Sequence, residues 1–471
     1  MKKKEKNHGL LKAIILCCVI AFVLTWIIPN GGLATSTSMK RLGLTDLSFV
    51  FYHALYYSLD KIILLFTIGG LYGVLTKTSA YDKLTSNIAK KLSKHKTLFV
   101  VLVSVLIALL TSVIAQGYVL IIFIPFIISI MNRMKLDKIT VLSATFGALL
   151  VGTMGATYGS EGVVYLNQYF IGTTPNILKD TLLVRAGILL VGLVLFNFFT
   201  VMHMKKTTDN NEIVEDMFLE EKEDESKINT SLPIVVILGL MFIITILGYV
   251  NWADNFGIEI FNTFHEKLTT IEVGKGFFLF KDLLGTQPEA LGTWELVFSM
   301  ASIVLIFTVI LGLCYKFKLD EFFDAYISGM KKVLKPIACV VAAWVLMVIV
   351  YLSPYVATII GKILGLTDGF NLATMTLSGL ITNIFHTDLG FSGYILSSHL
   401  VAEYADHIKP IYIMLVSLYG FVQFFIPTSA ILGIGVTSLN VKYKDWLKYI
   451  WKFVLGMFVC LIVIFALLTI I

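Results

Sequence analysis

The stretch that decides the fold is residues 97–131, TLFVVLVSVLIALLTSVIAQGYVLIIFIPFIISIM. As a single helix this segment would extend about 50 Å, whereas the hydrocarbon core of a bilayer is about 30 Å thick. Polar residues from Thr111 to Gly117 interrupt its middle, and several lysines and arginines flank both of its ends. We therefore predict a re-entrant hairpin that enters the bilayer, turns near Thr111–Gly117 and leaves by the same face.

The composition indicates a polytopic membrane protein. Hydrophobic residues make up 57% of the chain, charged residues only 14%, and the mean hydropathy is +0.85. The five cysteines lie inside apolar segments without metal-ligand spacing, and the sequence contains no nucleotide-binding phosphate loop. We expect no metal site, no cofactor, no nucleic-acid partner and no ATP-driven step.

Basic residues predict the orientation of the segments. With the N-terminus in the cytoplasm, the predicted cytoplasmic segments carry 26 of the 37 Lys and Arg residues, and the predicted outer loops carry 8. The remaining three, Lys12, Lys61 and Arg185, fall at predicted span ends. This bias satisfies the positive-inside rule with about nine transmembrane helices and two re-entrant hairpins. The predicted spans are 10–28, 59–76, 139–158, 181–203, 231–250, 293–315, 337–359, 411–438 and 453–471.

The order of these segments repeats with opposite hand, which predicts an inverted-topology repeat. Such a repeat is the usual architecture for alternating access. The predicted parts, in order, are a first repeat at 1–203 (hairpin 97–131, broken helix 139–170), a charged cytoplasmic linker at 204–230, a connecting helix at 231–250, an outer loop at 251–292, and a second repeat at 293–471 (hairpin 370–404, broken helix 411–438).

Small polar residues gather at the hairpin tips and helix interruptions. Helix ends at membrane depth expose N–H donors for a carboxylate and carbonyl acceptors for a cation. The alternative is that such residues only let helices pack closely, and that Pro427 only kinks its helix. The candidate substrate- or ion-binding residues are Thr111, Ser112, Gln116, Gly117, Gly155, Thr157, Thr382, Asn383, Thr387, Asp388, Gly390, Pro427, Thr428 and Ser429.

Asp388 and His386 are the candidates for ion coupling. Asp388 is the only acidic residue between positions 370 and 402, and His386 lies two residues before it. An ionisable group at membrane depth is costly and indicates a function. We expect Asp388 to carry a proton or to bind a cation. The alternative is a hairpin tip shallow enough for Asp388 to be solvated.

Four segments resemble the C4-dicarboxylate anaerobic carrier family, which includes the DcuC-like and YfcC-like carriers of the ion transporter superfamily. The resemblance implies secondary active transport, two hairpins per protomer, a site between hairpin tips and broken helices, and a homodimer. The segments are GGLYGVLTKTSAYDKL (69–84), SATFGALLVGTMGATYGS (143–160), FFIPTSAILGIGV (424–436) and YKDWLKYIWKFVLG (443–456).

The sequence thus predicts a secondary active transporter of a small carboxylate-bearing solute in the cytoplasmic membrane, working by symport or exchange. Dicarboxylate and amino acid stay open as substrates, as do Na⁺ and proton coupling. The three arginines, Arg41, Arg133 and Arg185, lie away from the predicted site, so a dicarboxylate would rely on backbone and hydroxyl donors. The alternative class is an intramembrane enzyme or an ion channel.

Overall fold

The all-helical fold predicted from the sequence is confirmed by a computed structural model, in which no strand occurs among the described residues. In the part of the chain that the structure describes, seven helices are long and apolar enough to cross a membrane: Gly9–Ile27, Asp46–Thr76, Ser79–Val113, Leu182–Lys206, Leu232–Tyr249, Leu334–Leu352 and Tyr443–Thr469. The structure describes residues 8–29, 41–159, 161–170, 174, 176–206, 213–214, 217–218, 230–285, 289–386, 388–393, 400 and 403–470.

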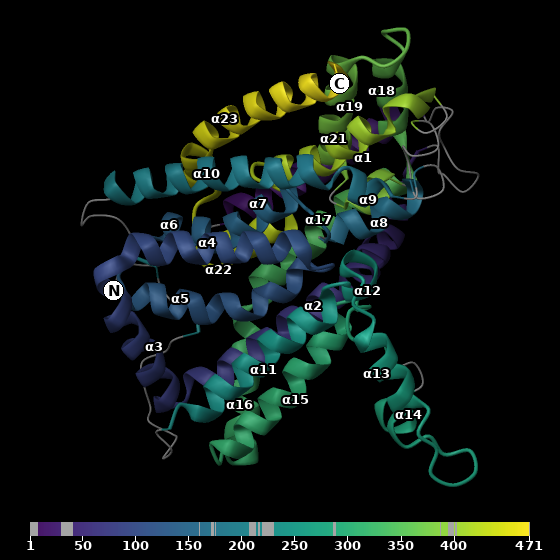
Figure 1. Cartoon of the computed structure of the whole chain (residues 1–471). Helices are drawn as coiled ribbons and strands as arrows, with labels where there is room; N and C mark the ends of the chain where they lie inside the picture. Colours follow the sequence, from purple (N-terminus) through teal and green to yellow (C-terminus); the bar gives the residue numbers. More distant parts are fainter. Residues whose placement is uncertain are drawn as a thin grey trace.

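One group of helices is built around α2, and we call it the α2 group. Glycines allow α2 to touch α16, because a Cβ on Gly329 would lie 2.0 Å from the carbonyl oxygen of Gly69. In Figure 1 this group runs obliquely to the rest of the molecule. Its members are α2 (Asp46–Thr76), α11 (Leu232–Tyr249), α15 (Phe298–Cys314), α16 (Leu319–Lys332) and α17 (Leu334–Leu352).

A second set of helices is connected by contacts that centre on α7, α10 and α21, and we call it the α7 group; one member, α22, also packs against α17 of the α2 group. Within the α7 group, α4 and α10 lie side by side (Figure 1). Gly420 of α21 touches α7, because a Cβ there would lie 2.2 Å from the Cα of Met154. The members are α4 (Lys96–Val113), α5 (Ile124–Arg133), α7 (Ala148–Met154), α8 (Glu161–Phe170), α10 (Leu182–Lys206), α19 (Leu372–Phe385), α21 (Ile408–Val422), α22 (Ala430–Ser438) and α23 (Tyr443–Ile470).

Segment 97–131 folds as two helices with a non-helical corner. Helix α4 ends at Val113, and a 3₁₀ segment, Gly117–Phe123, leads into α5. Pro125 stands in the first turn of α5, where its missing N–H leaves no helical hydrogen bond unmade. The polar corner therefore lies where the sequence interrupts its apolar run.

Both predicted broken helices contain a break. The first consists of α6 (Lys138–Leu142), a π-helix (Ser143–Gly147) and α7, and helix resumes only at α8. The second breaks between α21 and α22, at the segment that holds Pro427. Because proline lacks an N–H, the helix cannot continue through this position with all its hydrogen bonds.

Several helix boundaries differ from the predicted spans. Helix α2 begins at Asp46, well before the predicted start at 59, so Lys61 lies in mid-helix. Helix α23 begins at Tyr443, before the predicted start at 453. The segment predicted as one span at 337–359 is divided at Ser353 into α17 and α18 (Tyr355–Leu364). The predicted outer loop contains three short helices and projects from the body (Figure 1): α12 (Trp252–Phe256), α13 (Ile260–Thr269) and α14 (Leu279–Leu284).

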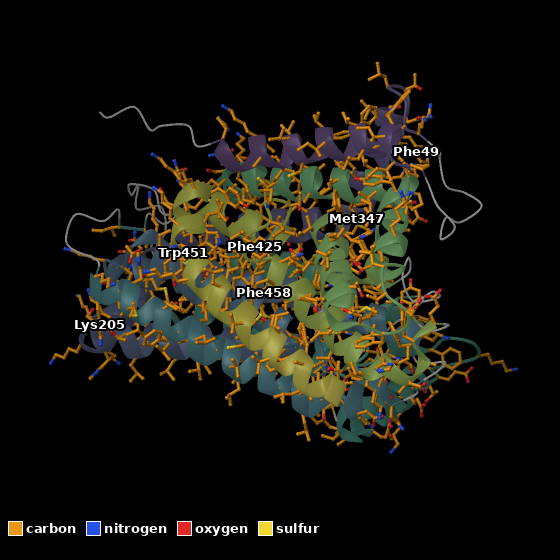
Figure 2. The ribbon with its side chains drawn as sticks, turned by 90° about the horizontal axis from the view of Figure 1, so that it is seen from above. Phe49, Lys205, Met347, Phe425, Trp451 and Phe458 are labelled. Atoms are coloured by element: carbon orange, nitrogen blue, oxygen red, sulfur yellow. The ribbon has the colours of Figure 1, made fainter. Side chains whose placement is uncertain are left out.

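The remaining helices cover the ends and edges. Helix α1 (Gly9–Ile27) runs beside α17, and Figure 2 shows Phe49 of α2 and Lys205 of α10 at opposite ends of the molecule. Two short helices, α3 (Ser79–Leu92) and α9 (Ile177–Asp180), precede α4 and α10. Val214 and Phe218, in the linker for which the sequence predicted no folded domain, are buried against this core.

Candidate functional site

A cavity of about 530 Å³ lies between the two helix groups. One wall comes from α2, α17 and the start of α15, and the other from the α4–α5 corner, α8 and the segment after α19. The lining is rich in aromatic rings and includes three charged side chains. The lining residues are Tyr56, Tyr57, Leu59, Asp60, Lys61, Gln116, Tyr165, Tyr169, Leu296, Phe298, Trp344, Tyr351, Asp388, Gly390 and Phe391.

Asp60 and Lys61 form an ion pair in the middle of α2. The Lys61 Nζ lies 3.1 Å from Asp60 Oδ2, and Lys61 is only 6% exposed. The same ammonium lies 5.3 Å from the ring centroid of Trp344 and 5.7 Å from that of Tyr118. A carboxylate and two aromatic faces thus offset the cost of burying a cation at this depth.

Asp388 faces this pair from the opposite wall. It is 8% exposed, and its Oδ1 accepts a hydrogen bond from the N–H of Phe391 at 3.2 Å. Asp388 lies close enough to both Lys61 and Asp60 for electrostatic interaction with each of them. With both carboxylates ionised, the three charges of the cavity sum to one negative charge.

Gln116 contributes an uncommitted acceptor to the cavity. Its side chain is 1% exposed, and its Nε2 is 3.5 Å from the carbonyl oxygen of Glu295. Its Oε1 has no hydrogen-bond partner within the described part of the chain. A buried acceptor without a partner costs about 1–3 kcal/mol, so this oxygen is suited to receive a donor from a bound solute.

Aromatic rings from both groups meet at one end of the cavity. Tyr57 stacks on Trp344 with centroids 6.0 Å apart, and Phe391 lies edge-on to Tyr57 at 5.7 Å. Tyr351 contacts the same Phe391 ring at 5.2 Å. The ring of Phe391, from the α7 group, is thereby inserted among rings of the α2 group.

The predicted first hairpin tip, which is the α4–α5 corner, contacts the first helix break. The N–H and hydroxyl of Thr157 both donate to the carbonyl oxygen of Ser112, at 2.8 and 2.9 Å. A Cβ on Gly152 would lie 2.6 Å from the Cβ of Thr111, and one on Gly155 would lie 2.4 Å from the Cα of Leu189. Thr111, Ser112, Gly155 and Thr157 thus contact other helices and do not line the cavity, and neither does Gly117.

Arg185 was missed as a neighbour of this tip. The prediction that every arginine lies away from the candidate residues is wrong, because the Arg185 guanidinium donates to the carbonyl oxygens of Ala156 and Thr157. Its Nε donates to the Thr181 hydroxyl at 3.1 Å, and the side chain is fully buried. Arg185 therefore satisfies carbonyls that the break leaves without helical partners.

The second tip is held by its own hydrogen bonds. The Thr382 hydroxyl donates to Ser378 O at 2.7 Å, and the Ser392 hydroxyl donates to Asn383 Oδ1 at 3.4 Å. His386 is fully buried, with Nδ1 3.0 Å from Thr382 O and no partner for Nε2 among the described residues. Thr382, Asn383 and His386 do not line the cavity. Thr387 lies outside the described residues.

The second break is closed by α23. The Trp446 Nε1 donates to Phe424 O at 2.8 Å, and the Tyr443 hydroxyl donates to Phe425 O. Ser429 caps α22 by accepting a hydrogen bond from Leu432 N. Pro427, Thr428 and Ser429 do not line the cavity.

Of the candidate residues, the structure brings Gln116, Asp388 and Gly390 to one cavity. Gly390 is required there, because a Cβ would lie 2.8 Å from the Cβ of Tyr165. The prediction missed Asp60 and Lys61. The apolar run FVFYHALYYSL at 49–59, directly before this pair, was the available signal that the helix starts earlier.

A second, polar cavity of about 230 Å³ adjoins the first. At the α4–α5 corner, Gln116 lines the first cavity and its neighbour Ala115 lines the second. On the facing segment, Leu296 lines the first cavity and Glu295 lines the second. The second cavity is lined by Val113, Ala115, Tyr158, Val163, Asn167, Gln168, Leu178, Tyr249, Asn251, Asp254, Asn255, Gly292, Thr293, Trp294 and Glu295.

These features define a polytopic helical membrane protein with a charged cavity between two helix groups. The chain belongs to the C4-dicarboxylate anaerobic carrier (DcuC) family, whose model matches residues 35–471. Family membership makes it a membrane transporter and points to a carrier rather than an enzyme.

Among solved structures, the chain is similar to the YdaH transporter of Alcanivorax borkumensis. The identity is 13%, the alignment covers 97% of this chain and 98% of that chain, and the TM-score is 0.36. A comparison with curated proteins finds no match.

Proposed function

We propose that this protein is a secondary active transporter that moves a small carboxylate-bearing solute across the cytoplasmic membrane, by ion-coupled symport or exchange. The observation that carries the proposal is the cavity between the helix groups, with Lys61 on one wall and Asp388 on the other. A site shared by two groups changes shape when the groups move relative to each other, which is what alternating access requires.

Lys61 is the proposed partner of a solute carboxylate, since its ammonium is the cationic group of the cavity lining. The carboxylates of Asp60 and Asp388 would repel a second negative charge on the solute. A dicarboxylate would therefore bind together with a proton or a cation at Asp388, whereas an amino acid brings its own ammonium to that carboxylate. Both substrate classes stay in the proposal: a dicarboxylate gives Asp388 a role in ion coupling, and an amino acid gives it a role in binding the substrate ammonium.

The polar second cavity is the proposed entrance. It adjoins the charged cavity, and the contact between Gln116 Nε2 and Glu295 O closes the wall that the two share. Parting of the α4–α5 corner from the segment before α15 would open that wall. Gln116, with its uncommitted oxygen, would be the first side chain to meet the solute.

The proposed topology retains nine crossings, two re-entrant hairpins and an inverted repeat. One similarity between the halves supports it: in each, a long helix further along the chain supplies side chains to the break carbonyls. Arg185 of α10 does so in the first half, and Tyr443 and Trp446 of α23 do so in the second. A homodimer remains part of the proposal.

The decisive experiment is uptake of labelled solute into proteoliposomes with imposed gradients. A C4-dicarboxylate and a set of amino acids would be offered under a proton gradient, a sodium gradient, or counterflow without either. We expect saturable uptake of one class, driven by one gradient. Conductive flux without saturation would indicate a channel and would contradict the carrier proposal.

Asp388→Asn tests the coupling role. We expect it to abolish gradient-driven uptake, because the variant can neither bind a proton nor hold a cation by charge. If protonation is its role, counterflow exchange should persist in part. Wild-type gradient-driven uptake at equal amounts of folded protein would show that Asp388 has no part in coupling. Asp180→Asn is a control, since that carboxylate pairs with Lys409 away from the cavity.

A further inference from the structure

Part of the charged linker after α10 is folded against the α7 group. The N–H of Val214 donates to Leu136 O at 2.9 Å, and Ile213 pairs with Asp137 in an antiparallel bridge. The Asn132 side chain donates to the carbonyl oxygen of Val214, and Val214 is fully buried. These contacts tie the segment to the loop that follows α5.

The same segment is bound to the α2 group a few residues later. Lys332 Nζ donates to Phe218 O at 3.2 Å. The ring of Phe218, which is 3% exposed, lies 5.5 Å from that of Tyr72. Because Tyr72 belongs to α2 and Lys332 to α16, the described linker residues 213–214 and 217–218 together contact both helix groups.

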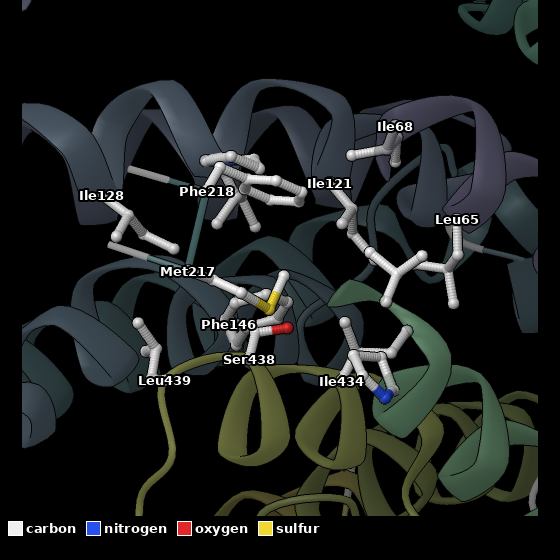
Figure 3. Close-up of a pocket in the computed structure, with 14 residues that line it drawn as sticks. Leu65, Ile68, Ile121, Ile128, Phe146, Met217, Phe218, Ile434, Ser438 and Leu439 are labelled. Carbon is white, nitrogen blue, oxygen red and sulfur yellow. The ribbon is translucent and has the colours of Figure 1, made fainter. Parts of the chain in front are cut away.

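Met217 and Phe218 are inserted where the two groups meet. They line a small cavity of about 30 Å³, to which the α2 group contributes Leu65 and Ile68. Figure 3 shows Met217 between Phe218 and Ile128 on one side and Phe146 and Ser438 on the other. The remaining space is about that of one water molecule, so the two side chains fill the gap between the groups.

We propose that Val214, Met217 and Phe218, which we call the linker clamp, hold the two helix groups in the arrangement seen here and must withdraw before the groups can move. The inference rests on the proposed alternating-access function. A buried contact that exists in one arrangement and is lost in the other favours the first by its binding free energy. The clamp therefore slows the conformational step of transport without contacting the solute.

Two variants test this in proteoliposomes. Phe218→Ala removes the larger clamp side chain and should raise the initial uptake rate about threefold or more, with little change in KM, because a clamp contact opposes the motion. Ile434→Ala is the matched control, since Ile434 lines the same cavity from α22 and lies apart from Met217 and Phe218 in Figure 3. It should leave the rate within about twofold of the wild type, because it removes packing from the cavity wall and leaves the clamp side chains in place.

A disulfide tests the opposite direction. In the Met217→Cys/Ser438→Cys variant, oxidation should reduce uptake at least about tenfold, and a reductant should restore it, because the covalent bond prevents withdrawal. The wild type with its native cysteines is treated in parallel. Wild-type uptake by the oxidised variant, with the disulfide verified by mass spectrometry, would overturn the clamp. So would an unchanged rate for Phe218→Ala.

A measurement without transport separates this inference from the proposed function. Single Met217→Cys should react slowly with a maleimide, and Phe218→Ala should accelerate the reaction. The exposed native Cys314 is the internal reference. Reaction of Cys at 217 as fast as that of Cys314 contradicts the clamp, even if the wild type transports nothing. Absence of wild-type uptake together with slow reaction contradicts only the proposed function.

Discussion

At the scale of single residues, the Asp60–Lys61 pair controls the charge of the cavity. Lys61→Gln should lower uptake at least about tenfold, because a charge-assisted hydrogen bond to a carboxylate contributes about 1.5–3 kcal/mol. Lys61→Arg should retain part of the activity, since it keeps the positive charge. Initial rates at equal amounts of folded protein measure the effect.

Lys61→Gln alone leaves the Asp60 carboxylate buried without its cation, so it could act through instability. The double variant Asp60→Asn/Lys61→Gln removes both charges and should recover thermal stability while uptake stays low. If the double variant transports like the wild type, Lys61 does not bind the solute carboxylate.

The sequence located some of these residues and missed others for a physical reason. Asp388 and Gln116 were found because each interrupts an apolar run, which is a local property of the chain. Lys61 was placed at a span end because a lysine next to an apolar run resembles a membrane border. The neighbours that permit its burial, Trp344 and Tyr118, come from other helices and are visible only in the fold.

At the scale of elements, the contact between α7 and α21 depends on Gly420. Gly420→Ala should destabilise the protein by about 1–3 kcal/mol, because the added methyl would lie 2.2 Å from the Met154 Cα, and backbone cannot move aside cheaply. Gly361→Ala on α18 is the control, since a Cβ there meets no atom within 4 Å. In detergent, Gly420→Ala should unfold at a lower temperature than Gly361→Ala. Equal unfolding temperatures of the two variants would contradict the close contact.

The start of α6 gives a pH-dependent prediction. Burial raises the pKa of Asp137. Hydrogen bonds from His203 and from the side chain and N–H of Thr140 lower that pKa, and the net pKa lies below its usual value. A lowered folded-state pKa stabilises the protein above the unfolded-state pKa of about 3.9, and the stabilisation is lost as the pH falls through the folded-state value.

The wild type should therefore unfold at a higher temperature than Asp137→Asn at pH 7, and the difference should shrink below about pH 4. Asparagine keeps an acceptor for the N–H groups of Ile139 and Thr140, so the variant retains the cap of α6. A difference that is unchanged at pH 3 would assign the effect to packing.

Element boundaries followed from the sequence where length and polarity are decisive. The break of segment 97–131 and the interruptions at Gly155 and Pro427 were expected at the positions where helix ends. The folded linker residues were not expected, because Val214 and Phe218 stand among charged residues, and their burial depends on a groove made by distant helices.

At the scale of the whole molecule, charge predicts the orientation. A reporter fused after Ile471 should give an outer signal, and reporters at the N-terminus and in the linker should give cytoplasmic signals. The basis is the distribution of 26 cytoplasmic against 8 outer Lys and Arg residues. A cytoplasmic signal at the C-terminus would contradict nine crossings and, with them, the inverted repeat.

The carbonyls of the first helix break and the guanidinium of Arg185 also bear on how the chain is made. If the first helix break entered the lipid without α10, its carbonyl groups would lack hydrogen-bond donors. If α10 entered the lipid without the break, the Arg185 guanidinium would lack its carbonyl acceptors. The guanidinium and the carbonyls satisfy each other's hydrogen bonds only when both segments are present. We therefore expect the break to wait beside the insertion machinery until α10 has been synthesised, so that the two segments are released into the bilayer as one unit.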